Sequence, residues 1–200
     1  MAKASWVNVT PSSGSGNATV NVSSNAPHTG RKARTTVLTW KAASVEDQVR
    51  YVSQAGKPEY VDIADTAASD QSGQVVTIGG VSNSARLSFS LGSGSLQISL
   101  PSNYTANSQQ TANGAAISGD PGAVAEYNFA ISITVPANTG TSALTRQIIV
   151  TNEAGQKDTC TLTLAAGNAY LEITLGDIEL GWEGNPVTVQ VSSNTTWEIV

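Results

Sequence analysis

The sequence is poor in the residue types on which most enzymes and disulfide-bonded domains depend. Among its 200 residues there is one cysteine, Cys160, and one histidine, His28, and charged residues make up only 12%. A single cysteine excludes an intramolecular disulfide, and one histidine in a predicted turn provides poorly for nucleophilic or acid–base catalysis. Cys160 lies in an alternating apolar and polar run, so we expect it to be a small strand side chain.

Positive charge is also scarce. The net charge is −5 and the pI is near 4.7, whereas a nucleic-acid surface needs clustered lysine and arginine. The one basic cluster, Arg31, Lys32 and Arg34, lies at a predicted turn and strand start, so we expect no nucleic-acid partner.

Long apolar runs are missing as well. Nothing approaches the roughly 18 consecutive apolar residues of a membrane span. Met1–Ser5 leads straight into the strand pattern Trp6–Val9, without a signal-peptide stretch or a lipoprotein cysteine. We therefore expect a protein with no membrane partner, made in a cytoplasm and carried elsewhere by something other than secretion.

The acidic residues do not form a recognisable catalytic or metal-binding motif. Glycoside hydrolysis needs two carboxylates at a defined separation in a cleft, and a calcium loop needs dense oxygen ligands, which Glu153 and Asp158 do not supply. A phosphate-binding loop, a His/Cys zinc cluster and a Gly-x-Ser-x-Gly motif are all missing. We predict no enzyme activity, no metal and no cofactor. The nearest carboxylate pairs fall on predicted turns and strand edges: Glu46–Asp47, Asp62–Asp65 and Asp177–Glu179.

What is present is a series of short alternating runs with a turn signal about every ten residues, which is typical of all-β sandwiches. The run Tyr127–Val135 is the clearest. In the strand predicted over Val45–Ser53, we expect Val45, Val49 and Tyr51 to face inward. We also predict a strand through Leu96, Ile98 and Leu100. Asn103–Gly122 shows no convincing strands, and we interpret it as a long functional or mobile loop.

Several motifs return at an offset of about 110 residues, as expected for tandem copies of one domain. Gly30 matches Gly140, and Arg34–Thr39 matches Arg146–Thr151. Ala55–Ile63 matches Ala166–Ile173 with one residue dropped. We therefore predict three units, residues 1–57, 58–168 and 169–200.

The motif order resembles the BACON domain, an immunoglobulin-like β-sandwich of Bacteroidetes and their phages. That family opens with a Tyr-Leu-x-Val/Ile strand and Ser-Asn-x-x-Trp, and closes with Trp-Leu-x-Val-x-Pro-x-x-Gly, Arg-x-Ala-x-Ile-x-Val and Val-x-Gln-x-Gly. The middle unit departs from this pattern, with Arg86 near the place of the first tryptophan and no glutamine in Leu164–Gly167. The opening motifs lie in Tyr170–Ile173 and Ser193–Trp197, and the closing ones in Trp6–Gly14, Arg31–Val37 and Val52–Gly56.

The resemblance implies tandem immunoglobulin-like sandwiches with incomplete domains at both ends. Residues 1–57 correspond to a closing half, 58–168 to a complete but divergent sandwich, and 169–200 to an opening half. We expect the two halves to complete each other, either within one folded-back chain or head to tail between subunits by strand addition. The alternative is a fragment of a longer tandem protein. The residues expected to serve assembly are Trp6, Tyr170, Leu171, Ile173, Val189, Val191 and Trp197.

Two functions from different classes fit these features. The first is a structural protein of a phage virion, such as a crAss-like phage: a capsid decoration, head-fibre or tail-associated protein, with residues 103–122 as a docking or adhesive surface and other virion proteins or like subunits as partners. The second is a carbohydrate- or mucin-binding accessory module of a bacterial cell-surface glycan-use protein. Sugar faces stack on exposed aromatic rings, and Trp40 and Trp182 are the candidate ligand-binding residues.

Overall fold

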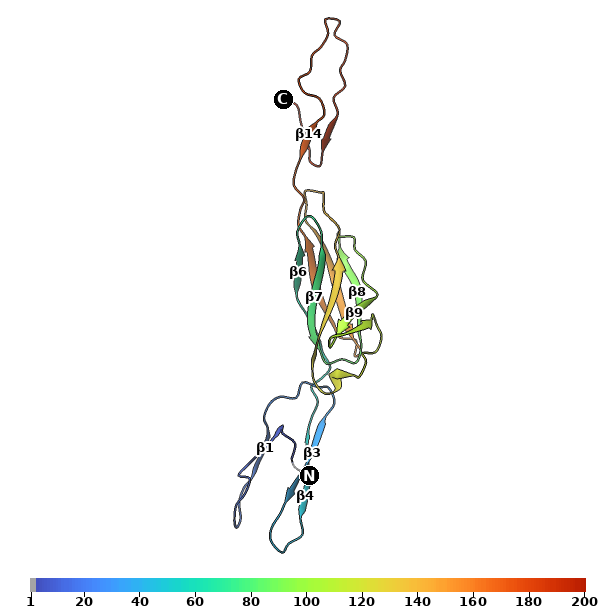
Figure 1. Ribbon diagram of the computed structural model, residues 1–200. Helices are drawn as coiled ribbons and strands as arrows, with labels where there is room; N and C mark the ends of the chain where they lie inside the picture. The colour runs from blue at the N-terminus through green and yellow to red at the C-terminus, as the bar shows by residue number, and fades with distance from the viewer. Residues whose placement is uncertain (1–2) are drawn as a thin grey trace.

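A computed structural model describes residues 3–200 as an elongated, almost entirely β protein in which three parts follow one another in a line (Figure 1). A pair of hairpins occupies one end, a two-layer β-sandwich the middle and a long thin hairpin the other end. The two chain termini therefore lie in opposite end parts of the molecule. In residues 3–200 there is no helix that is long and apolar enough to cross a membrane.

The middle part is a sandwich of a five-stranded and a four-stranded sheet. Apolar side chains alternate along its strands, so each sheet turns one face inward and both contribute to a single core. Ile131 and Ile133 from one sheet and Ile148, Val150 and Leu162 from the other are at most 1% exposed. The first sheet has the order β10 (Gln109–Ala112), β9 (Asn103–Ala106), β11 (Tyr127–Thr134), β7 (Val75–Ser82) and β5 (Val61–Ile63). The second has the order β6 (Thr66–Ser69), β13 (Lys157–Leu164), β12 (Leu144–Asn152) and β8 (Leu87–Gly94).

The N-terminal part contains two separate antiparallel hairpins. β1 (Val7–Thr10) pairs with β2 (Asn21–Ser24), and β3 (Arg34–Trp40) pairs with β4 (Gln48–Gln54). Val7 and Leu38 are buried, at 1% and 6% exposure. The other side chains of the N-terminal part are largely exposed, so this part has only a small core.

The C-terminal part has less structure still. β14 (Leu171–Ile173) pairs with β15 (Val191–Ser193), and the chain between them forms a long excursion away from the sandwich (Figure 1). Its apolar side chains are exposed: Leu171 is 53%, Ile173 56% and Ile178 51% accessible.

The fold confirms an all-β chain and corrects three local predictions. The segment 103–122 is ordered and not a strandless loop: β9 and β10 form a hairpin whose tip residues, Asn107 and Ser108, have φ of 47° and 63°, as a type I′ turn requires. The 3-10 helix η1 (Pro121–Ala123) closes the segment. Its small polar residues concealed short strands, of which β9 buries Tyr104 and Ala106; Ile117, which follows the hairpin, is also buried.

The second correction concerns residues 96–100, which belong to no strand, although Leu96 is 1% exposed and Ile98 and Leu100 pack against the core. The third concerns β4. Register places Tyr51 opposite Val37 and Arg50 opposite the buried Leu38, so the even-numbered residues face inward. Tyr51 is 81% exposed, and Val45 and Val49 are also exposed. Because side chains alternate along a strand, an assignment that is wrong by one residue places every side chain on the wrong face.

Candidate assembly site and its junctions

The junction between the N-terminal hairpins and the sandwich is organised by Asn83, which follows β7 and is fully buried. Its side-chain oxygen accepts a hydrogen bond from the Tyr60 amide at 2.9 Å. Its amide nitrogen lies 3.2–3.3 Å from the carbonyl oxygens of Thr29, Lys57 and Pro58. Asn83 thus connects two segments of the N-terminal part, one at Thr29 and one at Lys57–Pro58, to the start of β5.

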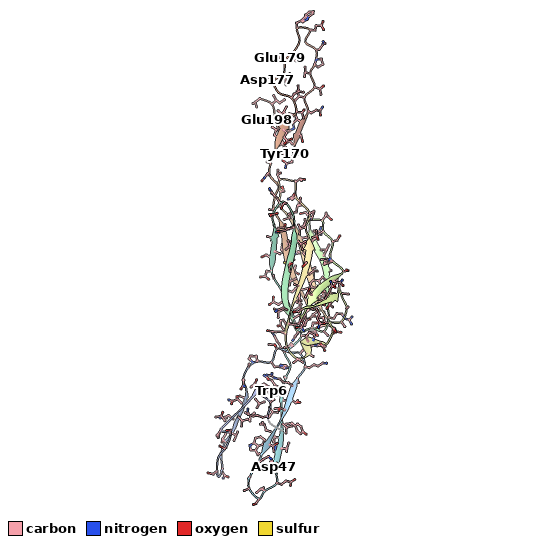
Figure 2. All side chains as sticks on the ribbon, in the orientation of Figure 1. Trp6, Asp47, Tyr170, Asp177, Glu179 and Glu198 are labelled. Atoms are coloured by element: carbon pink, nitrogen blue, oxygen red, sulfur yellow. The ribbon has the colours of Figure 1, made fainter. Side chains whose placement is uncertain are left out.

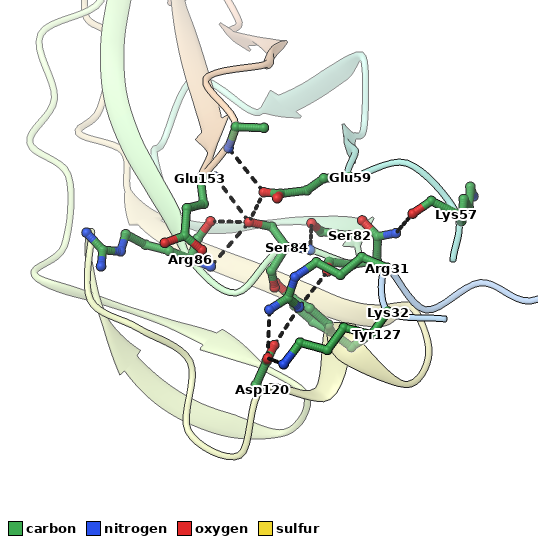
Figure 3. A network of polar contacts seen from close by, with 12 residues as sticks. Arg31, Lys32, Lys57, Glu59, Ser82, Ser84, Arg86, Asp120, Tyr127 and Glu153 are labelled. Atoms are coloured by element: carbon green, nitrogen blue, oxygen red, sulfur yellow. Dashed lines mark hydrogen bonds and ion pairs between the residues drawn. The ribbon is translucent and has the colours of Figure 1, made fainter. Parts of the chain in front are cut away.

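An ion pair reinforces this junction (Figure 3). The Arg31 guanidinium donates to both carboxylate oxygens of Asp120, at 2.5 and 2.6 Å. This bidentate hydrogen bond lowers the pKa of Asp120 and raises that of Arg31. The backbone amides of Arg31 and Lys32 donate to Gly122 and Ala123 at 2.9 and 3.1 Å. The N-terminal part is therefore held to the sandwich by both backbone and side-chain bonds.

The junction between the sandwich and the C-terminal part repeats the asparagine contacts. The Asn194 oxygen accepts from the Tyr170 amide at 3.0 Å, and its amide nitrogen donates to Thr139 and Asn168 at 2.7 and 2.9 Å. Ser193 donates to the Tyr170 carbonyl at 2.9 Å, as Ser82 does to that of Tyr60 at 2.7 Å. The two Ser-Asn dipeptides therefore have the same role at successive junctions.

The strand register repeats as well. Val61 pairs with Ser82 and Ile63 with Gly80 in the sandwich, whereas Leu171 pairs with Ser193 and Ile173 with Val191 in the C-terminal part. β14 and β15 thus correspond to β5 and the end of β7. The motif match at an offset of about 110 residues is accompanied by matching hydrogen bonds and matching strand pairing.

The N-terminal part presents an open cleft of about 580 Å³ between β1 with its following turn and β3. Val9, Leu38 and Trp40 are among the residues lining it. Trp6 lies beside this part of the structure, partly buried under the Arg34 guanidinium, which is 4.5 Å from the ring centroid. The sequence marked Trp6 for assembly and Trp40 for ligand contact, and the structure places both on this end.

The remaining predicted assembly residues lie together on the C-terminal part. Tyr170, Leu171, Ile173 and Trp197 are exposed, at 44–56% accessibility, and Val189 and Val191 are half-buried. Trp182, the second predicted ligand-binding residue, is 95% exposed in the excursion between β14 and β15 of the C-terminal part, whereas Trp40 ends β3 of the N-terminal part. From the sequence, Asn194 was noted only as part of the Ser-Asn-x-x-Trp motif and Asn83 was missed, although the Ser-Asn dipeptide that precedes both junction contacts is repeated at residues 82–83 and 193–194.

The carboxylates considered in the sequence do not converge on one site. Asp177, Glu179 and Glu198 lie on the C-terminal part and Asp47 at the opposite end (Figure 2). Asp47 forms an ion pair with Lys41 at 3.0 Å, and the Asp158 carboxylate accepts a hydrogen bond from the Ile63 amide at 2.7 Å. Among residues 3–200, no three His, Cys, Asp or Glu side chains are grouped as metal ligands.

Cys160 and His28 also lie apart. Cys160 is completely buried in β13, and burial raises the pKa of its thiol to about 11. The His28 imidazole contacts the Lys32 carbonyl at 2.7 Å in the linker. Cys160 is the strand side chain that its alternating run predicted.

Comparison with known proteins identifies no family. No family model and no curated protein matches the chain. Among solved structures, an endo-fucoidan hydrolase of glycoside hydrolase family 107 aligns with 82% of this chain at 10% identity and a TM-score of 0.31. The chain spans only 22% of that hydrolase, and a likeness at this level carries no functional argument.

Proposed function

We propose that this protein is a non-enzymatic structural module, built of tandem immunoglobulin-like sandwiches resembling BACON domains and acting by assembly and surface adhesion. The observation that carries this proposal is the repeated junction. Asn83 and Asn194 make equivalent contacts at two successive boundaries, which is what units arranged in series require.

The proposed setting is a phage virion, as a capsid decoration, head-fibre or tail-associated protein. An elongated chain of small β units with exposed apolar surfaces at both ends suits a projecting, assembled part. Mass spectrometry of purified phage particles from the source that encodes this chain tests the setting. We expect the protein at a fixed number of copies per particle; its recovery solely from cell-envelope fractions would contradict a virion role.

A second function, as a carbohydrate-binding module of a surface glycan-use protein, rests on the two exposed indole rings. Trp40 borders the 580 Å³ cleft, and Trp182 is 95% exposed. Flat, accessible rings stack on the C–H faces of sugars. A glycan array tests this function with Trp40→Ala and Trp182→Ala as matched variants. Signal that disappears in one variant would support it, and background signal for the unaltered protein would exclude it.

A further inference from the structure

We propose that the C-terminal part of one molecule docks onto the N-terminal part of another, completing a second β-sandwich between the two. The occupant of the open cleft is thus residues 169–200 of a second copy of this chain. This names the partner for the assembly role proposed above and rests on its modular architecture, but it requires no virion. Within one molecule the two parts lie at opposite ends (Figure 1), so the folded-back arrangement is not the one this structure adopts.

The central sandwich supplies the template for this docking. There, β11 pairs with β7, β12 pairs with β8, and β13 pairs in parallel with β6. The N-terminal counterparts of β11, β12 and β13 are β2, β3 and β4, and in the described structure each pairs only within its own hairpin. The shift of 111 residues that relates Asn83 to Asn194 maps β6 to residues 177–180, β7 to 186–193 and the start of β8 to 198–200; of these, only Val191–Ser193 is a strand in the single molecule. Each open edge therefore has a matching segment on the other end, which docking would turn into a paired strand.

The apolar surfaces match in the same way. The N-terminal part exposes its cleft and Val22, which is 42% accessible. The C-terminal part exposes Leu180, Val187 and Ile199 at 65%, 41% and 87%. In the template, the counterparts of Val22 and Val187 are Ile133 and Val76, which pair directly across β11 and β7 and are at most 8% exposed. Docking would remove this surface from water.

Charge distinguishes the two ends and favours a second copy as the partner. Residues 1–57 contain seven lysines and arginines and two acidic residues, whereas residues 169–200 contain five acidic residues and no lysine or arginine. Figure 2 shows Asp177, Glu179 and Glu198 on the C-terminal part. Opposite net charges attract head to tail and repel head to head.

The geometry also predicts the form of the assembly. A head-to-tail contact is heterologous, and it yields an open filament unless the rotation between subunits closes a ring. Because the three parts lie in a line (Figure 1), we expect open chains of increasing length.

Sedimentation velocity of the full chain over a range of concentrations gives the first test. We expect species that grow with concentration and shrink with added salt, because salt screens the opposite charges. A chain that stays monomeric at every concentration would overturn the proposal, and would show that something other than a second copy covers these faces.

A cysteine pair tests the register. In the template, the outward side chains of Thr77 and Ser132 contact each other at 2.9 Å. Their counterparts are Thr188 and Asn21, so the double variant Asn21→Cys, Thr188→Cys should form disulfide-linked ladders on oxidation. The matched control, Asn21→Cys with Ser192→Cys, places the second thiol about 13 Å further along the strand. Equal crosslinking of both variants would refute strand pairing, and the native Cys160 is buried and does not interfere.

Two single variants separate specific docking from aggregation. Val22→Asp disables the N-terminal face and Val187→Asp the C-terminal face, and both positions are exposed in the single molecule. Each variant alone should remain monomeric, whereas their mixture should form heterodimers and nothing longer, because only one functional face of each kind remains. Longer species in the mixture, or no dimer, would contradict the proposal. Mass spectrometry of virions decides the phage setting separately, so either proposal can fail without the other.

Discussion

Replacing Asn83 by alanine should destabilise the protein far more than the same change at Asn194. Asn83 is fully buried, and its side chain contacts the Tyr60 amide and three carbonyl oxygens. Each buried polar group left without a partner costs about 1–3 kcal/mol. Because several groups lose their partner together, we expect a loss of about 3–5 kcal/mol, a large share of the roughly 5–15 kcal/mol that stabilises a typical domain.

Asn194 is the matched control because it makes equivalent hydrogen bonds while its residue is only half-buried. Water replaces the lost partners there, so Asn194→Ala should cost only about 0.5–1.5 kcal/mol. The comparison thus keeps three equivalent contacts and changes the burial; Asn83 additionally contacts the Pro58 carbonyl oxygen.

The assay should report on the sandwich and not on the ends. All four tryptophans lie outside residues 58–168, so their fluorescence follows the end parts. Urea unfolding followed by far-ultraviolet circular dichroism measures the free energy of unfolding, and hydrogen exchange at the Tyr60 amide measures the local loss. If Asn83→Ala costs no more than Asn194→Ala, the buried asparagine does not hold the junction and the reasoning fails.

Three further predictions concern the junction and the core. Gly30→Ala should loosen the first junction, because a Cβ there would collide with the backbone of Val124. At the counterpart Gly140 the nearest atom to a Cβ would be 3.4 Å away, so Gly140→Ala should have the smaller effect. Faster hydrogen exchange in the Gly140→Ala variant than in Gly30→Ala would contradict this. Since the folded-state pKa of Asp120 is lowered by Arg31, its stabilising contribution is present above the unfolded pKa of about 3.9 and is lost as the pH falls through the folded value. The protection of the Arg31 and Lys32 amides, taken relative to the intrinsic exchange rate at each pH, should therefore fall in acid, and Asp120→Asn should remove that pH dependence; an unchanged dependence in the variant would exclude Asp120 as its source. The Cys160 thiol, fully buried and with its pKa raised to about 11, should react with a thiol reagent only when the sandwich opens; labelling of the native protein as fast as that of free cysteine would show that β13 is open.

Some of the fold followed directly from residue patterns. The strand over Tyr127–Thr134 was predictable because its apolar residues alternate without interruption, and all four odd-numbered ones from Tyr127 to Ile133 are buried. The alternating run around Cys160 indicated β13 for the same reason. The hairpin over β9 and β10 was not predictable in this way, since its strands are short and polar and its turn has no glycine at the tip.

The candidate assembly site was also only partly predictable from the sequence. The sequence assigned Leu171, Ile173 and Trp197 to assembly; the structure places all three exposed on the C-terminal part, and their assembly role stays a prediction. It gave no indication of Arg31 pairing with Asp120, because the two residues are 89 positions apart and come together only when η1 packs beside the linker. The inward face of β4 also depends on pairing with β3, since parity within a strand does not say which face is covered.

By itself, the sequence determined the all-β class, the repeat at about 110 residues and the end segments rich in strand-forming residues, because alternation and motif spacing are properties of the chain read locally. Only the tertiary structure decided that the two end parts lie at opposite ends, that a buried asparagine connects the first junction, and which apolar side chains of the end parts stay exposed. These features depend on which segments distant in sequence meet in space. Where such segments meet, the buried polar groups of the backbone need hydrogen-bond partners, because burying them unpaired is unfavourable.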